Sequence, residues 1–146
     1  YTVSTAGAFG ALILCGSRGA EAVSYEDLAG LGRRHPAAAL PFALFIFSLA
    51  GVPPTAGFFG KWFVFRAAMD GGFYALTIIA FINSVIGAYY YLRVVWYMYF
   101  ADPIDTTPLN AASDMRIVMS VNGLGLLALG LFPGGLLDLC ARVLGP

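Results

Sequence analysis

The sequence has 146 residues, of which 60% are hydrophobic and 11% are charged, with eight Lys and Arg against eight Asp and Glu. Soluble domains usually carry about 25% charged residues, and the mean hydropathy of this chain is +0.80. The composition excludes a disordered chain and a basic nucleic-acid-binding surface, and it favours a membrane protein.

The first apolar segment covers residues 1–16, which is shorter than the roughly 20 residues that a spanning helix needs. The chain begins at Tyr1, and its first residues already have the character of the middle of a helix. We therefore expect a C-terminal fragment of a longer membrane protein, with residues 1–146 forming a single transmembrane domain.

Residues 17–36 form the first polar segment, with six charged residues and the only histidine. This concentration of charge predicts a loop outside the hydrocarbon region of the bilayer. Within the loop, Ser24 and Asp27 have the spacing of a capping box, which predicts that a short helix begins there.

Residues 37–69 are largely apolar, and a straight helix of this length would reach about 50 Å against a hydrocarbon core of about 30 Å. Two adjacent prolines interrupt it. They remove two backbone donors and push the preceding residues out of the helical region. We therefore predict half-helices over 37–50 and 55–69, with a hinge formed by Gly51, Pro53 and Pro54.

Two further spans follow, over residues 73–99 and 115–132. The first ends in a run of aromatic residues that is typical of the membrane interface. Pro133-Gly134-Gly135 interrupt the second, and residues 136–144 are expected at the interface. The complete pattern predicts an all-α, polytopic transmembrane helix bundle with one proline-broken helix.

The arginines predict the orientation of the bundle. Five of them lie on the side of the 17–36 loop and two on the opposite side, so the positive-inside rule makes the 17–36 loop cytoplasmic. The five are Arg18, Arg33, Arg34, Arg93 and Arg116, and the two are Arg66 and Arg142.

Lys61 is the only lysine and the main candidate for chemistry, because it lies inside the second half-helix among aromatic neighbours. Ionisable residues within a membrane are usually functional. Burial disfavours the charged ammonium, so such a lysine can pass a proton. Gly57 and Gly60 leave room beside it for water or another helix. The alternative is a structural lysine whose side chain reaches the lipid headgroups.

Asn83, Ser84 and Tyr90 lie on one face of the 73–99 helix. They are candidates for lining a channel beside Lys61, and the alternative is hydrogen bonding to a neighbouring helix. Arg66 and Asp70 are four residues apart, which predicts an ion pair on the helix surface. The sequence has no phosphate-binding loop and no metal-ligand spacing, so we expect neither a cofactor nor a metal on this chain.

Two segments, SLAGVPPTAGFFGKWFVF (48–65) and NSVIGAYYYLRVVWYMYF (83–100), resemble the N-type antiporter-like membrane subunits of NADH-quinone oxidoreductase, respiratory complex I. YEDLAGLGRRHP (25–36) is similar to a loop of the same family. The resemblance implies half of an inverted-repeat antiporter-like fold, in which each repeat holds one broken helix. Lys61 occupies the position of the family's titratable lysine. The family's first repeat is absent from this chain, and the family's glutamate and its other two lysines have no counterpart here.

The resemblance also implies a function, namely proton translocation coupled to quinone reduction. NADH, FMN, iron–sulfur clusters and quinone would belong to other subunits. The implied partners are the other membrane-arm subunits and membrane lipid, in a hetero-oligomer of the bacterial inner membrane without nucleic acid. Two alternatives remain: a subunit of a cation/proton antiporter of the same superfamily, and a helical bundle that serves only assembly.

Overall fold

The computed structural model describes residues 1–16, 24–103 and 113–144, and every regular element in these ranges is a helix. In chain order the helices are α1 (Thr2–Cys15), α2 (Leu31–Arg34), α3 (Pro36–Ala50), α4 (Ala56–Asp70), α5 (Tyr74–Phe100), α6 (Ser113–Leu131) and α7 (Gly134–Leu144). The five predicted spans correspond to α1, α3, α4, α5 and α6 within two residues at each end. Gly134 and Gly135 were expected in the interruption, but they begin α7.

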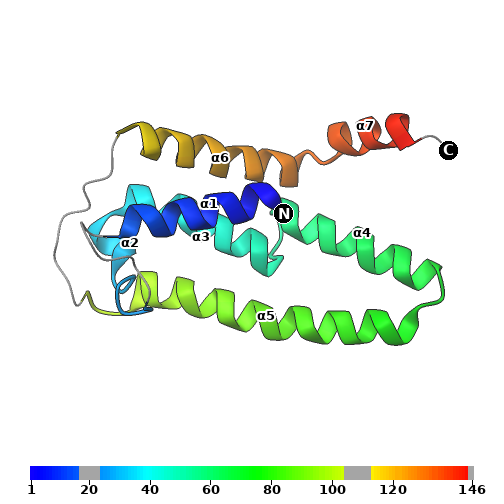
Figure 1. Ribbon diagram of the computed structural model, residues 1–146, viewed down its shortest axis with the longest axis horizontal. Coiled ribbons are helices and arrows are strands. Elements are labelled where there is room, and N and C mark those ends of the chain that lie inside the picture. Colours follow the sequence, from blue (N-terminus) through cyan, green and yellow to red (C-terminus); the bar gives the residue numbers. More distant parts are fainter. Residues whose placement is uncertain (17–23, 104–112, 145–146) are drawn as a thin grey trace.

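Helix α3 is the centre of the bundle. It packs against α1 and α6 on one side and against α5 on the other. Helix α4 continues from the end of α3 in a similar direction, and α5 returns antiparallel to both of them (Figure 1). The α4–α5 turn closes at Gly72, whose φ of +79° suits a residue without a Cβ. The two half-helices α3 and α4 therefore lie one after the other along the length of α5.

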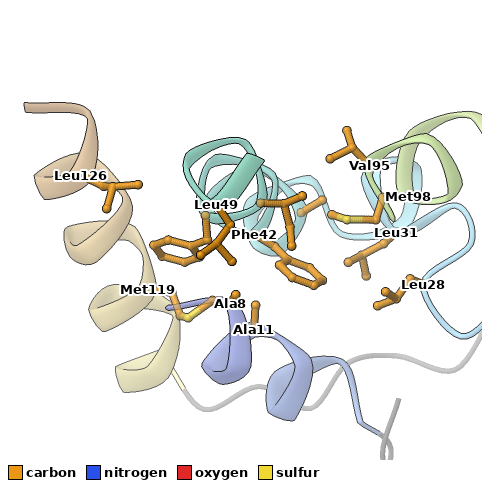
Figure 2. Packing of buried hydrophobic residues seen from close by; sticks show 13 residues of the cluster. Ala8, Ala11, Leu28, Leu31, Phe42, Leu49, Val95, Met98, Met119 and Leu126 are labelled. Atoms are coloured by element: carbon orange, nitrogen blue, oxygen red, sulfur yellow. The ribbon is translucent and has the colours of Figure 1, made fainter. Parts of the chain in front are cut away.

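The side chains of α3 fill the core. Phe42 and Phe45 are 1% and 0% exposed, and apolar residues of α1, α5 and α6 surround α3 (Figure 2). The Phe45 ring lies directly on the backbone of α1, because a Cβ added at Gly7 would collide with the ring. Close packing of this kind, with small residues at the contact, is typical of helix pairs in membranes.

The segment from Ser24 to Arg34 folds against the end of α5. The Tyr25 ring stacks on that of Tyr97 at 5.3 Å between centroids, and the Arg93 guanidinium lies over Tyr25 at 5.2 Å from its centroid. The backbone N–H of Gly30 donates to the carbonyl of Tyr97. These contacts fix the segment to the aromatic end of α5, in the part of α5 for which the sequence predicts an interfacial belt.

The prediction of a short helix beginning at Ser24 is wrong in position. The backbone N–H of Ser24 does donate to Asp27 Oδ2 at 2.9 Å, which is one half of a capping box. The residues that follow nevertheless form turns, and the short helix α2 begins only at Leu31, after Gly30 with φ +68°. The left-handed conformation of Gly30 ends the turns and sets the direction of α2.

Among the described residues, one helix is long and apolar enough to cross a membrane by itself, namely Tyr74–Phe100. Thr2–Cys15, Pro36–Ala50 and Ile117–Leu131 are shorter apolar helices. Along most of α5 the large apolar side chains point outward and are exposed. An outward apolar surface of this kind is the pattern expected of a helix whose surroundings are lipid or other membrane helices.

Candidate functional site at the break between α3 and α4

Helix α3 ends at Gly51, which has φ +83° and ψ +39°. The Gly51 N–H donates to the carbonyls of Phe47 and Ser48, and the Val52 N–H also donates to Phe47. This is the left-handed ending that glycine permits without steric cost. Pro53 and Pro54 follow and are both exposed. The predicted hinge is therefore the place where the chain leaves the helix.

Lys61 lies in the second turn of α4, and its side chain points back to the end of α3. Its Nζ donates to the carbonyl oxygen of Ala50 at 2.9 Å and to that of Leu49 at 3.2 Å. The last carbonyls of a helix have no partner within the helix, and they form the negative end of its dipole. The half-buried ammonium therefore caps the C-terminus of α3.

Gly51 contacts this lysine directly. A Cβ added at Gly51 would lie 2.9 Å from Lys61 Cδ and 3.1 Å from Lys61 Nζ. The residue thus has two functions at the break, since it takes the left-handed conformation and leaves room for the lysine side chain. Of the predicted site residues, the structure brings Gly51 and Lys61 together.

Ser48 of α3 caps the N-terminus of α4. The Gly57 N–H donates to Ser48 Oγ at 3.2 Å. Thr55, at the N-cap position of α4, makes no capping bond of its own, because its Oγ1 donates to the carbonyl of Val52 at 2.6 Å. The first N–H groups of a helix require such a partner, and here the preceding helix supplies it.

Two glycines allow close backbone contacts around the break. A Cβ at Gly57 would collide with the carbonyl oxygen of Ser48, and a Cβ at Gly130 of α6 would collide with that of Pro54. The room expected at Gly57 is thus filled by α3, whereas nothing within the described residues lies within 4 Å of a Cβ at Gly60. Helix α6 therefore covers one side of the break.

The candidates on α5 lie elsewhere. Asn83 is exposed and donates to the carbonyl of Ile79 in its own helix at 3.0 Å. Tyr90 is exposed and has edge-to-face contact with Tyr89, while Ser84 is half-buried. The contacts seen for Asn83 and Tyr90 stay within α5 and do not reach Lys61. Their role in lining a channel stays a prediction.

The predicted ion pair on α4 is confirmed. Arg66 Nε lies 3.9 Å from Asp70 Oδ2, with both side chains about 70% exposed or more. An exposed pair of this kind contributes little to stability.

Within the described residues, no group of three or more His, Cys, Asp or Glu side chains is placed to hold a metal ion.

Sequence reasoning missed two residues of the site. The sequence predicted no role for Ser48 or Gly130. Ser48 did offer a signal, because it carries the one hydroxyl group in the last turn of the apolar helix α3. Both act through contacts between elements that are distant in the sequence, so their roles follow from the fold.

Residues 1–87 match the family described as NADH:quinone oxidoreductase/Mrp antiporter, TM. The chain belongs to this family. The match includes the whole break with Lys61, and it agrees with the all-α fold of the described residues. The transmembrane fold class predicted from the sequence is thereby confirmed.

Within this family, the curated relatives that the chain matches are N-type subunits. The chain is 54% identical over 147 residues to NADH-quinone oxidoreductase subunit N 1 of Sorangium cellulosum, covering 97% of this chain and 28% of the relative. It is 48% identical to subunit N of Methylovorus glucosotrophus, covering 97% and 29%. The N-type resemblance seen in the sequence is confirmed. The chain spans less than a third of the length of these relatives.

A solved structure gives the same result in three dimensions. The fold matches a chain of respiratory complex I from Thermus thermophilus with bound aureothin, with a TM-score of 0.80 and 35% identity. The match covers 92% of this chain and 30% of that chain. The arrangement of helices in this family member is therefore shared with a complex I subunit.

Proposed function

We propose that the chain is part of a proton-translocating membrane subunit of a bacterial NADH-quinone oxidoreductase, in which Lys61 takes up and releases a proton. The names of the relatives and the likeness to a complex I chain support the assignment. The observation that carries it is the position of Lys61 Nζ, 2.9 Å and 3.2 Å from the two carbonyls that end α3. A titratable group is thus built into the break of the helix.

The geometry suggests how proton exchange and helix movement are linked. Hydrogen bonds from a charged donor are roughly twice as strong as those from a neutral one. When Lys61 loses its proton, its attraction to the end of α3 weakens, and the junction of α3 with α4 loosens. By linkage, a movement that separates α4 from α3 also changes how readily Lys61 holds its proton.

The energy of the Lys61 hydrogen bonds is comparable to the energy needed to move a proton against the membrane potential. Moving one charge against 100 mV requires about 2.3 kcal/mol, and charged hydrogen bonds contribute on the order of 1.5–3 kcal/mol each. The weakening of the two bonds to Ala50 and Leu49 is therefore of the required order of magnitude. Redox chemistry in other subunits would supply the movement, with NADH, FMN, iron–sulfur clusters and quinone bound there.

The proposal places this chain in a hetero-oligomer with the other membrane-arm subunits, as a multi-pass protein of the bacterial inner membrane. The residues 17–36 would face the cytoplasm, as the arginine distribution predicts. The exposed apolar side chains of α5 and α4 support membrane placement. In this role the chain itself carries no redox group.

The test is Lys61→Met in the complete subunit, within the assembled complex reconstituted in vesicles. We expect quinone reduction to continue while protons pumped per electron fall. Arg66→Met is the matched control, because it removes the other positive charge of α4 at an exposed position. Normal pumping per electron by assembled Lys61→Met complex would remove Lys61 from the mechanism.

A cation/proton antiporter without a redox partner is the second candidate, because the family description includes Mrp antiporters. The two candidates differ in their driving reaction. Proton movement that follows an imposed sodium gradient and does not respond to NADH and quinone would support the antiporter and contradict the first proposal.

A further inference from the structure

A buried pair of hydroxyl groups connects α1 to the break. Ser4 Oγ of α1 lies 2.8 Å from Ser48 Oγ of α3, and the two residues are 3% and 2% exposed. Burying a hydroxyl group without a partner is costly. Each serine therefore provides the hydrogen-bond partner that the other needs, although the two residues are 44 positions apart in the sequence.

The Ser48 hydroxyl has a second partner on α4. A hydroxyl offers one donor and two acceptor positions, so Ser48 Oγ can bond Ser4 and accept from the Gly57 N–H at the same time. Gly57 also packs on the Ser48 backbone so tightly that no side chain fits between them. Ser48 is thus the point at which α1, α3 and α4 meet.

Gly57 and Lys61 are one helical turn apart and lie on the same face of α4. Ser48 holds Gly57, and the two residues after Ser48 accept the bonds from Lys61 Nζ. Helix α4 is therefore attached to the end of α3 at two adjacent points. Loss of the Ser48 hydroxyl removes one of these two hydrogen-bonded attachments, so the direction and distance of Nζ are less closely fixed.

The first turn of α1 is itself held in place. Asn122 Nδ2 of α6 donates to the carbonyl of Val3 at 3.3 Å, and Gly7 packs under the Phe45 ring. The Ser4 hydroxyl is thereby presented to Ser48 from a helix that two neighbours position. A shift of α1 would be passed through the two serines to α4.

We propose that Ser4 and Ser48 are positioning residues for Lys61, which together set the distance between its ammonium and the end of α3. The inference rests on the proposed function of Lys61. Neither serine exchanges protons with the substrate path in this scheme. Their hydroxyl groups determine the geometry in which Lys61 does so.

The experiment uses Ser4→Ala, Ser48→Ala and the double variant in the assembled, reconstituted complex. Protons pumped per electron are measured across a pH series. Each single variant is expected to shift the pH midpoint of pumping by about half a unit or more, which corresponds to a change of the order of 0.7 kcal/mol. The double variant should shift it no further than Ser48→Ala alone, because the two hydroxyls form one unit.

Two further variants separate positioning from general stability. Ser48→Thr keeps the hydroxyl and is expected to retain the wild-type pH midpoint of pumping. Ser120→Ala removes an exposed hydroxyl of α6 and should also leave this midpoint unchanged. An unchanged pH profile in assembled Ser48→Ala and Ser4→Ala complexes would overturn the inference. Failure of both variants to assemble would also overturn it, because the pair would then serve folding alone.

The inference and the proposed function fail in different ways. If Lys61→Met pumps normally, the proposed function fails whatever the serine variants do. If Lys61→Met stops pumping while both serine variants keep the wild-type pH profile, only the positioning role of the serines is lost.

Discussion

Lys61 and Ser48 cap each other's helices across the break: the lysine ammonium of α4 bonds the carbonyls that end α3, and the serine hydroxyl of α3 accepts from an N–H that begins α4. A broken helix within a membrane requires partners for the backbone groups that the break frees. Here two side chains from the same pair of helices supply part of that requirement. One of the two is titratable, so the stability of the break depends on a proton.

Gly51→Ala should damage the break while leaving the helices on either side intact. The left-handed conformation costs a residue with a Cβ about 1–2 kcal/mol, and the added carbon would push Lys61 away from the carbonyls that it caps. We expect lower thermal stability of the assembled complex and fewer protons pumped per electron.

Gly87→Ala of α5 is the control for this prediction. Nothing in the described chain lies within 4 Å of the added carbon, and alanine is favoured over glycine in a helix by roughly 0.5–1 kcal/mol. Equal pumping and equal melting temperatures for Gly51→Ala and Gly87→Ala would contradict the account of Gly51.

Gly130→Ala tests whether α6 covers the break. The added carbon would collide with the Pro54 carbonyl, a backbone atom that has no alternative rotamer. Overpacking of this kind costs typically 1–3 kcal/mol, so the melting temperature and the yield of assembled complex should fall. Gly125→Ala lies on the same helix in open space and should behave like the wild type. A normal melting temperature for Gly130→Ala would show that α6 lies further from the break.

The position of the break could be predicted from the sequence, because its causes are local. Pro53 and Pro54 cannot continue a helix, and a glycine just before them is suited to end one. Lys61 was identifiable as the only lysine in an apolar segment. These properties belong to residues and their immediate neighbours, so no knowledge of the fold is needed.

The direction of the Lys61 side chain could not be predicted in the same way. It depends on how closely α4 lies beside the end of α3, and that distance is set by Gly57 and Ser48 together. Asn83 and Tyr90 show the same limit of sequence reasoning. Helical spacing placed them correctly on α5, but spacing alone does not say which face of α5 meets the broken helix.

Gly7 and Phe45 should show strong coupling in a double-mutant cycle. Gly7→Ala alone places a methyl group against the Phe45 ring and should destabilise the bundle. Phe45→Ala alone removes a fully buried ring, a change that costs roughly 3–5 kcal/mol in packed cores. The double variant should be less destabilised than the sum of the two, because the methyl group enters the vacated space. Additive effects on the melting temperature would show that the two residues are not in contact.

Lys61→Arg separates the structural function of the lysine from its proton exchange. Arginine keeps the positive charge and several N–H donors, so it can still bond the carbonyls at the end of α3. It does not lose its proton in proteins, so it cannot take part in proton exchange. We expect Lys61→Arg to assemble with a melting temperature closer to that of the wild type than Lys61→Met, but to pump as poorly as Lys61→Met. Pumping by the arginine variant at the wild-type ratio of protons to electrons would mean that a fixed charge at this position is sufficient, and that the proton follows another path.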